Sequence, residues 1–218
     1  LTTSFVRNLV FGCVLCLGPT WGQATVYHVS SSEGDDGHPG STSQPLASLE
    51  ALNALTLQPG DSVLFKAGDS WNGTFWPKGS GTLESPIVID RYGEGARPIL
   101  NGDGYQAAIL LYNEDHIVLR NLELTNEASH LDEFGVTKKR NGFGGEANSW
   151  GSGRDVRFGV KVVADNRSLN HFRMDNLYIH DIFPTPVNDN FVHRGYGIKF
   201  ETQSNTPNAT STGVCSLF

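Results

Sequence analysis

The sequence predicts an all-β chain folded as a parallel β-helix, a solenoid in which successive coils stack on one another. Residues 108–126 and 159–181 carry the same pattern twice, two short alternating strands joined by a polar turn. Other strand-like segments recur at steps of 22 to 24 residues, which fits one solenoid coil. Within each segment, alternation of period two places one stripe of apolar side chains inside and the other stripe outside.

The repeat predicts which residues lie side by side. It equates Ile109 with Val160, Leu111 with Val162, Leu119 with Met174, Asn121 with Asn176, Leu122 with Leu177, and Leu124 with Ile179. One track of equivalent strands is expected to run through residues 62–65, 86–89, 108–111, 159–162 and 197–200, and a second through Phe75, Ile99, Leu122 and Leu177. An antiparallel sandwich is the alternative, but its hairpins would not need equivalent strands at a fixed offset.

Residues 1–24 are typical of an export signal, because Arg7 precedes an apolar run and Gly22-Gln23-Ala24 supplies a cleavage site. A lipoprotein leader is the alternative, with Cys13 or Cys16 as a poorly fitting lipidation site. Residues 25–218 then form one β-helix domain, whose lone Cys215 predicts no internal disulfide.

The composition bounds the partners. The formal net charge of −7 argues against nucleic acid, which requires a basic face. The apolar run of the leader is too short for a membrane anchor. The mature chain is therefore expected to have no membrane or nucleic-acid partners. It is also expected to be a monomer.

A short helix and two insertions are expected beside the strands. Residues 45–57 read as an amphipathic helix with Ser43 as its N-cap, and this helix would cover the first coil. Residues 127–158 and 182–196 interrupt the regular step, and loops of this size are usually functional. They are expected to wall a groove against the strands.

Three segments carry a more specific resemblance: YHVSSSEGDD, LQPGDSVLFKAGDSWNG and SPIVIDRYGEGARPILNG. They resemble the amino-terminal part of secreted bacterial right-handed parallel β-helix proteins of the pectate-lyase-like superfamily. The resemblance implies a right-handed helix and a bacterial protein that is secreted, periplasmic or on the cell surface. It also implies an incomplete carboxy-terminal end, because more coils would be expected. It leaves the chemistry open, because lyases, glycoside hydrolases, epimerases and non-catalytic members share this scaffold.

Two outward lysines, Lys161 and Lys199, are expected to stack on adjacent strands. Stacked like charges cost energy unless an anion lies on them. Lysine or arginine on this face serves as base and carboxylate clamp in lyases of the family that the chain resembles. The alternative is that both lysines are solvated surface residues, paired with Glu201 or Asp175.

Further candidates surround the second insertion. His180, His193 and Arg194 are candidate catalytic groups, and Asp181, Asp189 and Glu201 are candidate calcium ligands or glycosidase carboxylates. Arg173, Tyr178 and Trp150 are candidates for clamping or stacking on sugar rings. Adjacent strand residues point to opposite faces, so His180 and Asp181 are not expected to face the groove together unless the strand has ended. In the alternative interpretation, Asp181 and Asn126 are equivalent residues that cap turns between coils.

Three functions remain open at this point. The first is a lyase that cleaves an acidic polysaccharide by β-elimination, with Ca²⁺ as a bridging ion. The second is a glycoside hydrolase on the same scaffold, which needs two carboxylates across the scissile bond. The third is a non-catalytic solenoid that binds glycan at the cell surface.

Overall fold

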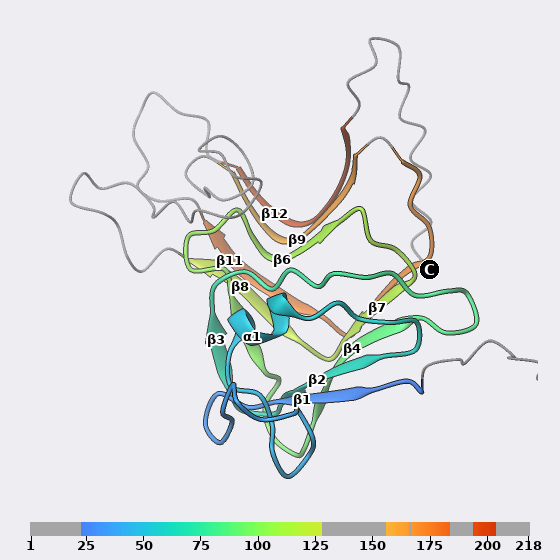
Figure 1. Ribbon diagram of the computed structural model, residues 1–218. Helices are drawn as coiled ribbons and strands as arrows, with labels where there is room; N and C mark the ends of the chain where they lie inside the picture. Colours follow the sequence, from blue (N-terminus) through green and yellow to red (C-terminus); the bar gives the residue numbers. More distant parts are fainter. Residues whose placement is uncertain (1–22, 128–155, 166, 184–193, 204–218) are drawn as a thin grey trace, which may run out of the picture.

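The structure, a computed structural model, describes residues 23–127, 156–165, 167–183 and 194–203. It contains three sheets that form the sides of a solenoid (Figure 1). The first sheet has the order β1 (Val26–Val29), β2 (Ser62–Lys66), β4 (Ile87–Tyr92), β7 (Ile117–Arg120) and β10 (Phe172–Asp175). The second has the order β11 (Tyr178–Phe183), β8 (Glu123–Glu127), β5 (Ile99–Asn101) and β3 (Ser70–Asn72). The third has the order β12 (Arg194–Gln203), β9 (Val156–Asp165) and β6 (Ala107–Tyr112).

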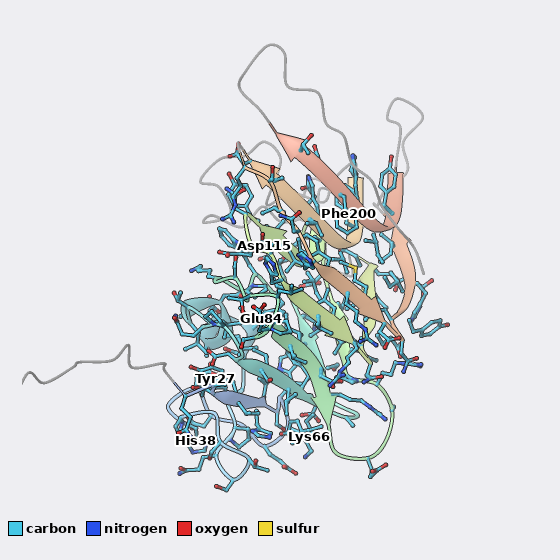
Figure 2. The ribbon with its side chains drawn as sticks, turned by 90° about the vertical axis from the view of Figure 1, so that its right-hand side faces the viewer. Tyr27, His38, Lys66, Glu84, Asp115 and Phe200 are labelled. Atoms are coloured by element: carbon cyan, nitrogen blue, oxygen red, sulfur yellow. The ribbon has the colours of Figure 1, made fainter. Side chains whose placement is uncertain are left out.

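Every strand pair in these sheets is parallel. The chain visits the first, second and third sheets in turn, as in β7, β8 and β9 and then β10, β11 and β12. Figure 2 shows the resulting progress along the stack, from Tyr27 near one end to Phe200 near the other. The predicted parallel β-helix is therefore confirmed.

The inward stripe of each sheet fills one continuous core. Its fully buried members include Val63, Ile89 and Leu119 of the first sheet, Leu100 and Leu124 of the second, and Ile109, Leu111 and Val160 of the third. Apolar burial on all three sides stabilises the stack without help from a disulfide in the described residues.

The register confirms the internal repeat. Ile109 pairs with Val160, Leu119 with Met174, and Leu124 with Ile179. The amide of Asn176 donates to Asn121 Oδ1 at 2.7 Å, so these two equivalent residues are bonded to each other at successive coils. Both adopt a left-handed backbone, which asparagine tolerates better than most residues.

The longer tracks were wrong in part. β2 and β4 belong to the first sheet, whereas residues 108–111, 159–162 and 197–200 belong to the third. Phe75 bridges to Ile109 of the third sheet instead of joining Ile99. The error has a physical cause, because all three sides of a coil carry the same inward-outward alternation.

The helix is shorter than predicted. α1 spans Leu49–Ala54, and its N-cap is Ser48, whose side chain accepts from Ala51 N. Leu46 lies outside the helix because its backbone pairs with β1: its N–H donates to His28 O at 2.9 Å. α1 still buries Leu49 and Leu52 in the core, as a capping helix should.

The inward side chains of β12 are less covered than those of the neighbouring coil. Ile198 and Phe200 are 41% and 47% exposed, whereas their partners Val160 and Val162 are buried.

Among the described residues, no helix combines the length and apolarity required to cross a membrane.

Candidate functional site on the outer face of the third sheet

The third sheet has a second buried surface on the side away from the core. Three ladders of paired residues build this site face: Ala107, Phe158 and Tyr196; Leu110, Lys161 and Lys199; and Tyr112, Val163 and Glu201. Ala107, Leu110, Phe158 and Val163 form an apolar cluster separate from the core. The three strands of this sheet curve together (Figure 1).

The phenylalanine and tyrosine side chains of one ladder are stacked. The rings of Phe158 and Tyr196 lie 5.4 Å apart at 20°, with Phe158 buried and Tyr196 partly exposed above it. Trp76 and Tyr112 add an edge-to-face pair at 6.5 Å that packs against the same cluster. The site face therefore offers partly exposed aromatic rings on a buried apolar floor.

A glycine explains how Phe158 reaches this face. A Cβ at Gly159 would come within 2.6 Å of Ile179 Cγ2 and 2.7 Å of Gly197 O, so the strand can bend there only without a side chain. The motif recurs one coil later, because Phe158-Gly159-Val160-Lys161-Val162 matches Tyr196-Gly197-Ile198-Lys199-Phe200. The aromatic residue before each glycine was the sequence signal for this site, and the sequence analysis missed it.

Lys161 lies in the floor of the site face and is only 4% exposed. Its Nζ donates to Gln106 Oε1 at 2.9 Å and lies 3.0 Å from Glu201 Oε2. It also lies 4.9 Å from the centre of the Phe158 ring, a cation–π contact. Burial lowers the pKa of the Lys161 ammonium, against the opposing effect of Glu201.

Lys199 is the neighbour of Lys161 across the strands, so the predicted stacking of the two lysines is confirmed. Its Nζ lies 3.9 Å from Glu201 Oε2 and 5.5 Å from the Tyr196 ring, and its side chain is 38% exposed. Glu201 thus lies close to both ammonium groups and supplies the anion that such a stack needs. The alternative interpretation is confirmed for the pairing with Glu201 but wrong for the solvation of Lys161, which is buried.

Asp165 is a second carboxylate at the edge of this face, and the sequence analysis did not identify it. The Tyr112 hydroxyl donates to Asp165 Oδ2, and this hydrogen bond raises the pKa of Tyr112. The backbone N–H of Asp165 donates to Asn113 Oδ1 at 2.7 Å. Gln106 was missed as well, because it lies in a corner between strands, where no periodic pattern marks it.

His180 lies on a different side of the solenoid, on the second sheet. Its Nδ1 is 2.7 Å from Asp181 Oδ2 and its Nε2 is 3.0 Å from Glu123 Oε1. The hydrogen bonds with Asp181 and then Glu123 raise the pKa of His180. Tyr178, 51% exposed, lies beside it with ring centres 4.3 Å apart.

His180 and Asp181 contact each other although they are adjacent residues of one strand. β11 continues through both residues, but a β-bulge falls between the pairs of Ile179 and Ile182 with β8. Asp181 has φ of 50° at this bulge, which turns its carboxylate back to His180. The extra residue also makes Ile182, and not Asp181, the partner of Asn126.

The remaining predicted residues do not gather at one groove. Arg173 lies on the first sheet, 70% exposed at its side chain, and contacts Asp175 at 3.2 Å. Trp150, Asp189, His193 and the side chain of Arg194 lie outside the described residues, as do most of the two predicted insertions. Asp181 and Glu201 are on different sheets, and no metal-binding group of three or more His, Cys, Asp or Glu occurs in the described ranges. Calcium binding stays a prediction.

Known proteins resemble this chain in sequence and in fold. No family model matches the chain. A lacto-N-biosidase of Bifidobacterium longum subsp. longum is 29% identical, in a match that covers 81% of this chain and 13% of that protein. The crystal structure of a GH136 lacto-N-biosidase from Eubacterium ramulus superposes with a TM-score of 0.63 and 32% identity, over 83% of this chain and 30% of that one. The chain is similar to lacto-N-biosidases.

The matches cover only part of the length of each lacto-N-biosidase. The chain spans less than a third of the length of either lacto-N-biosidase. A rhamnogalacturonan lyase also matches, with a TM-score of 0.46 and 14% identity over 83% of this chain.

Proposed function

We propose that this chain belongs to a carbohydrate-active protein, a glycoside hydrolase of the lacto-N-biosidase type, and that the site face is part of its saccharide-binding surface. The observation that carries the proposal is the 32% identity to a lacto-N-biosidase over 83% of the chain, at a TM-score of 0.63. That likeness includes sequence as well as fold, so it favours hydrolysis over the elimination reaction that the lysine pair suggested.

The charges of the site face also favour an uncharged saccharide. A polyuronate lyase needs cations that are available to the substrate carboxylate. Lys161 is buried and lies 3.0 Å from Glu201, and Lys199 lies near the same carboxylate. Glu201 balances one of the two ammonium charges, and the carboxylate of Asp165 lies at the edge of the same face. The site face therefore has little net positive charge for a polyanion, whereas lacto-N-biose is an uncharged disaccharide.

The proposal assigns binding, and not bond cleavage, to the site face. Tyr196 would stack on a sugar ring, because its own ring is held flat by Phe158 beneath it. Lys199 would donate hydrogen bonds to sugar hydroxyls. Glu201 is tied to Lys161, so the two carboxylates that cleave the glycosidic bond are not assigned to this face. Export by way of residues 1–24 belongs to the same proposal.

Tyr196→Ala is expected to lower the affinity for an oligosaccharide ending in lacto-N-biose about tenfold, since a lost stacking contact is worth about 1 kcal/mol or slightly more. Isothermal titration or ligand-observed NMR with the full chain would measure the change. Tyr178→Ala is the matched control, because Tyr178 is also an exposed tyrosine on a strand but lies on the second sheet. Equal losses in both variants, or tighter binding of an oligouronate by the parent chain, would contradict the proposal.

A further inference from the structure

We infer that Asn126, held by Arg157, is a positioning residue for the site face. Its buried amide fixes the backbone of Phe158 and of the corner before Gln106. These two segments in turn place the Phe158 ring and the Lys161 ammonium in the floor of the site face. The part of this inference that concerns saccharide affinity rests on the proposed function. The part that concerns the placement of Lys161 does not.

Asn126 is fully buried where β8 ends, and its side chain joins two other segments. Its Nδ2 donates to Tyr105 O at 2.8 Å and to Phe158 O at 3.2 Å. Tyr105 belongs to the corner that leads into β6, and Phe158 belongs to the beginning of β9. One amide group therefore connects a corner of one coil to a strand of the next coil.

Arg157 holds Asn126 from the other side. Its side chain is fully buried, and its Nη1 donates to Asn126 O at 3.0 Å. Burial lowers the pKa of this guanidinium to about 10, which the negative charge of Asp103 partly counteracts. The bond joins the end of β8 to the start of β9, two points that are 31 residues apart in the sequence. A buried arginine is costly unless it is hydrogen-bonded, so its position here implies a fixed arrangement.

The connection continues from these bonds to the site face. Phe158 N donates to Gln106 O at 2.8 Å, and Gln106 Oε1 accepts the hydrogen bond from Lys161. The Phe158 ring supports both Tyr196 and the Lys161 ammonium. A shift of the Phe158 backbone would thus change the aromatic stack and uncover the lysine together.

A glycine shows how closely the corner is fitted to Asn126. A Cβ at Gly102 would lie 2.5 Å from the Asn126 Cγ and Oδ1, so only glycine leaves room for the amide. Gly102 does not have the left-handed φ of Gly104, and the three atoms nearest to an alanine Cβ there all belong to the Asn126 amide. Gly102→Ala therefore displaces the amide without removing it.

The test is the rate at which an amine-acylating reagent modifies Lys161, measured by peptide mass spectrometry and divided by the rate for Lys199 in the same sample. Lys161 is 4% exposed in the parent chain, so its relative rate is expected to be low. Asn126→Ala and Gly102→Ala are each expected to raise it about tenfold by increasing local opening of the floor. Both are expected to lower saccharide affinity at a temperature where the chain is fully folded.

Asn121→Gly is the matched control. Asn121 bonds Asp90 and Asn176 at another corner, and glycine tolerates its left-handed backbone. This variant is expected to lose thermal stability while Lys161 stays protected and affinity stays unchanged. The inference would be overturned if Lys161 stays protected in both Asn126→Ala and Gly102→Ala while their melting temperatures fall as in Asn121→Gly. That result would show that Asn126 has a structural role alone. Exposure of Lys161 with unchanged saccharide affinity would overturn the link to binding, and a parent chain that binds no saccharide would count against the proposed function only.

Discussion

Glu201→Leu is expected to lower the free energy of unfolding by about 3 kcal/mol, near the lower end of the cost of removing one partner of a buried ion pair. The reason is that Lys161, 4% exposed, would keep its charge without the carboxylate 3.0 Å away. Glu201 itself is 31% exposed at its side chain, which limits the loss. Urea denaturation would measure it.

Lys161→Met is the comparison that separates charge from packing. Methionine fills a similar volume without a charge, and Glu201 keeps Lys199 at 3.9 Å, so this variant is expected to lose less stability than Glu201→Leu. The double variant is expected to be more stable than Glu201→Leu alone. Equal losses in the two single variants would mean that the pair does not carry the effect.

The same pair predicts a dependence on pH. Burial lowers the pKa of Lys161 in the folded chain, so between that value and the pKa of the unfolded chain the unfolded state binds more protons. Between these two pKa values the free energy of unfolding therefore rises with pH. Without Glu201 the folded pKa is lower still, so the rise in Glu201→Leu is expected to begin at a lower pH.

Phe65→Ala is expected to destabilise the chain by about 3–5 kcal/mol, the usual cost of emptying a buried phenylalanine site. Phe65 has no exposed surface, and its ring makes edge contacts with Trp71 at 5.0 Å and Phe75 at 5.5 Å. These rings come from three consecutive segments of the first coils, so the cavity would loosen the end of the stack that α1 covers.

Two controls accompany this variant in the same denaturation series. Phe65→Leu keeps most of the volume and is expected to cost about 1.5 kcal/mol or less. Leu83→Ala removes a side chain that is 63% exposed and is expected to change stability by about 0.5 kcal/mol at most. A loss in Phe65→Ala no larger than in Leu83→Ala would contradict the described core.

The sequence was sufficient for the fold because the repeat is local and regular. The pairing of Ile109 with Val160 and of Asn121 with Asn176 follows from one shared pattern, and the structure has both. It was not sufficient to assign strands to sides, because β2 and β6 carry the same alternation on different sheets. A period of two says that a side chain faces inward but not which sheet carries it.

The site was harder to predict for a related reason. Stacking of Lys161 on Lys199 could be predicted from strand register, but the burial of Lys161 depends on Gln106 and Glu201, which are distant in sequence or one coil away. His180 and Asp181 meet through a β-bulge, and the alternation of residues in the sequence does not reveal the extra residue of a bulge. His180 and the two lysines were all candidate catalytic groups, but they lie on two sides of the solenoid, on the second and third sheets.

The most direct test of the account is to map where an uncharged oligosaccharide ending in lacto-N-biose contacts the chain, by chemical-shift changes of backbone amides during a titration. If the site face binds the saccharide, the largest changes are expected on β9 and β12 around Lys161, Tyr196 and Lys199. Largest changes around Tyr178 and His180 on the second sheet, or around Arg173 on the first, would contradict it.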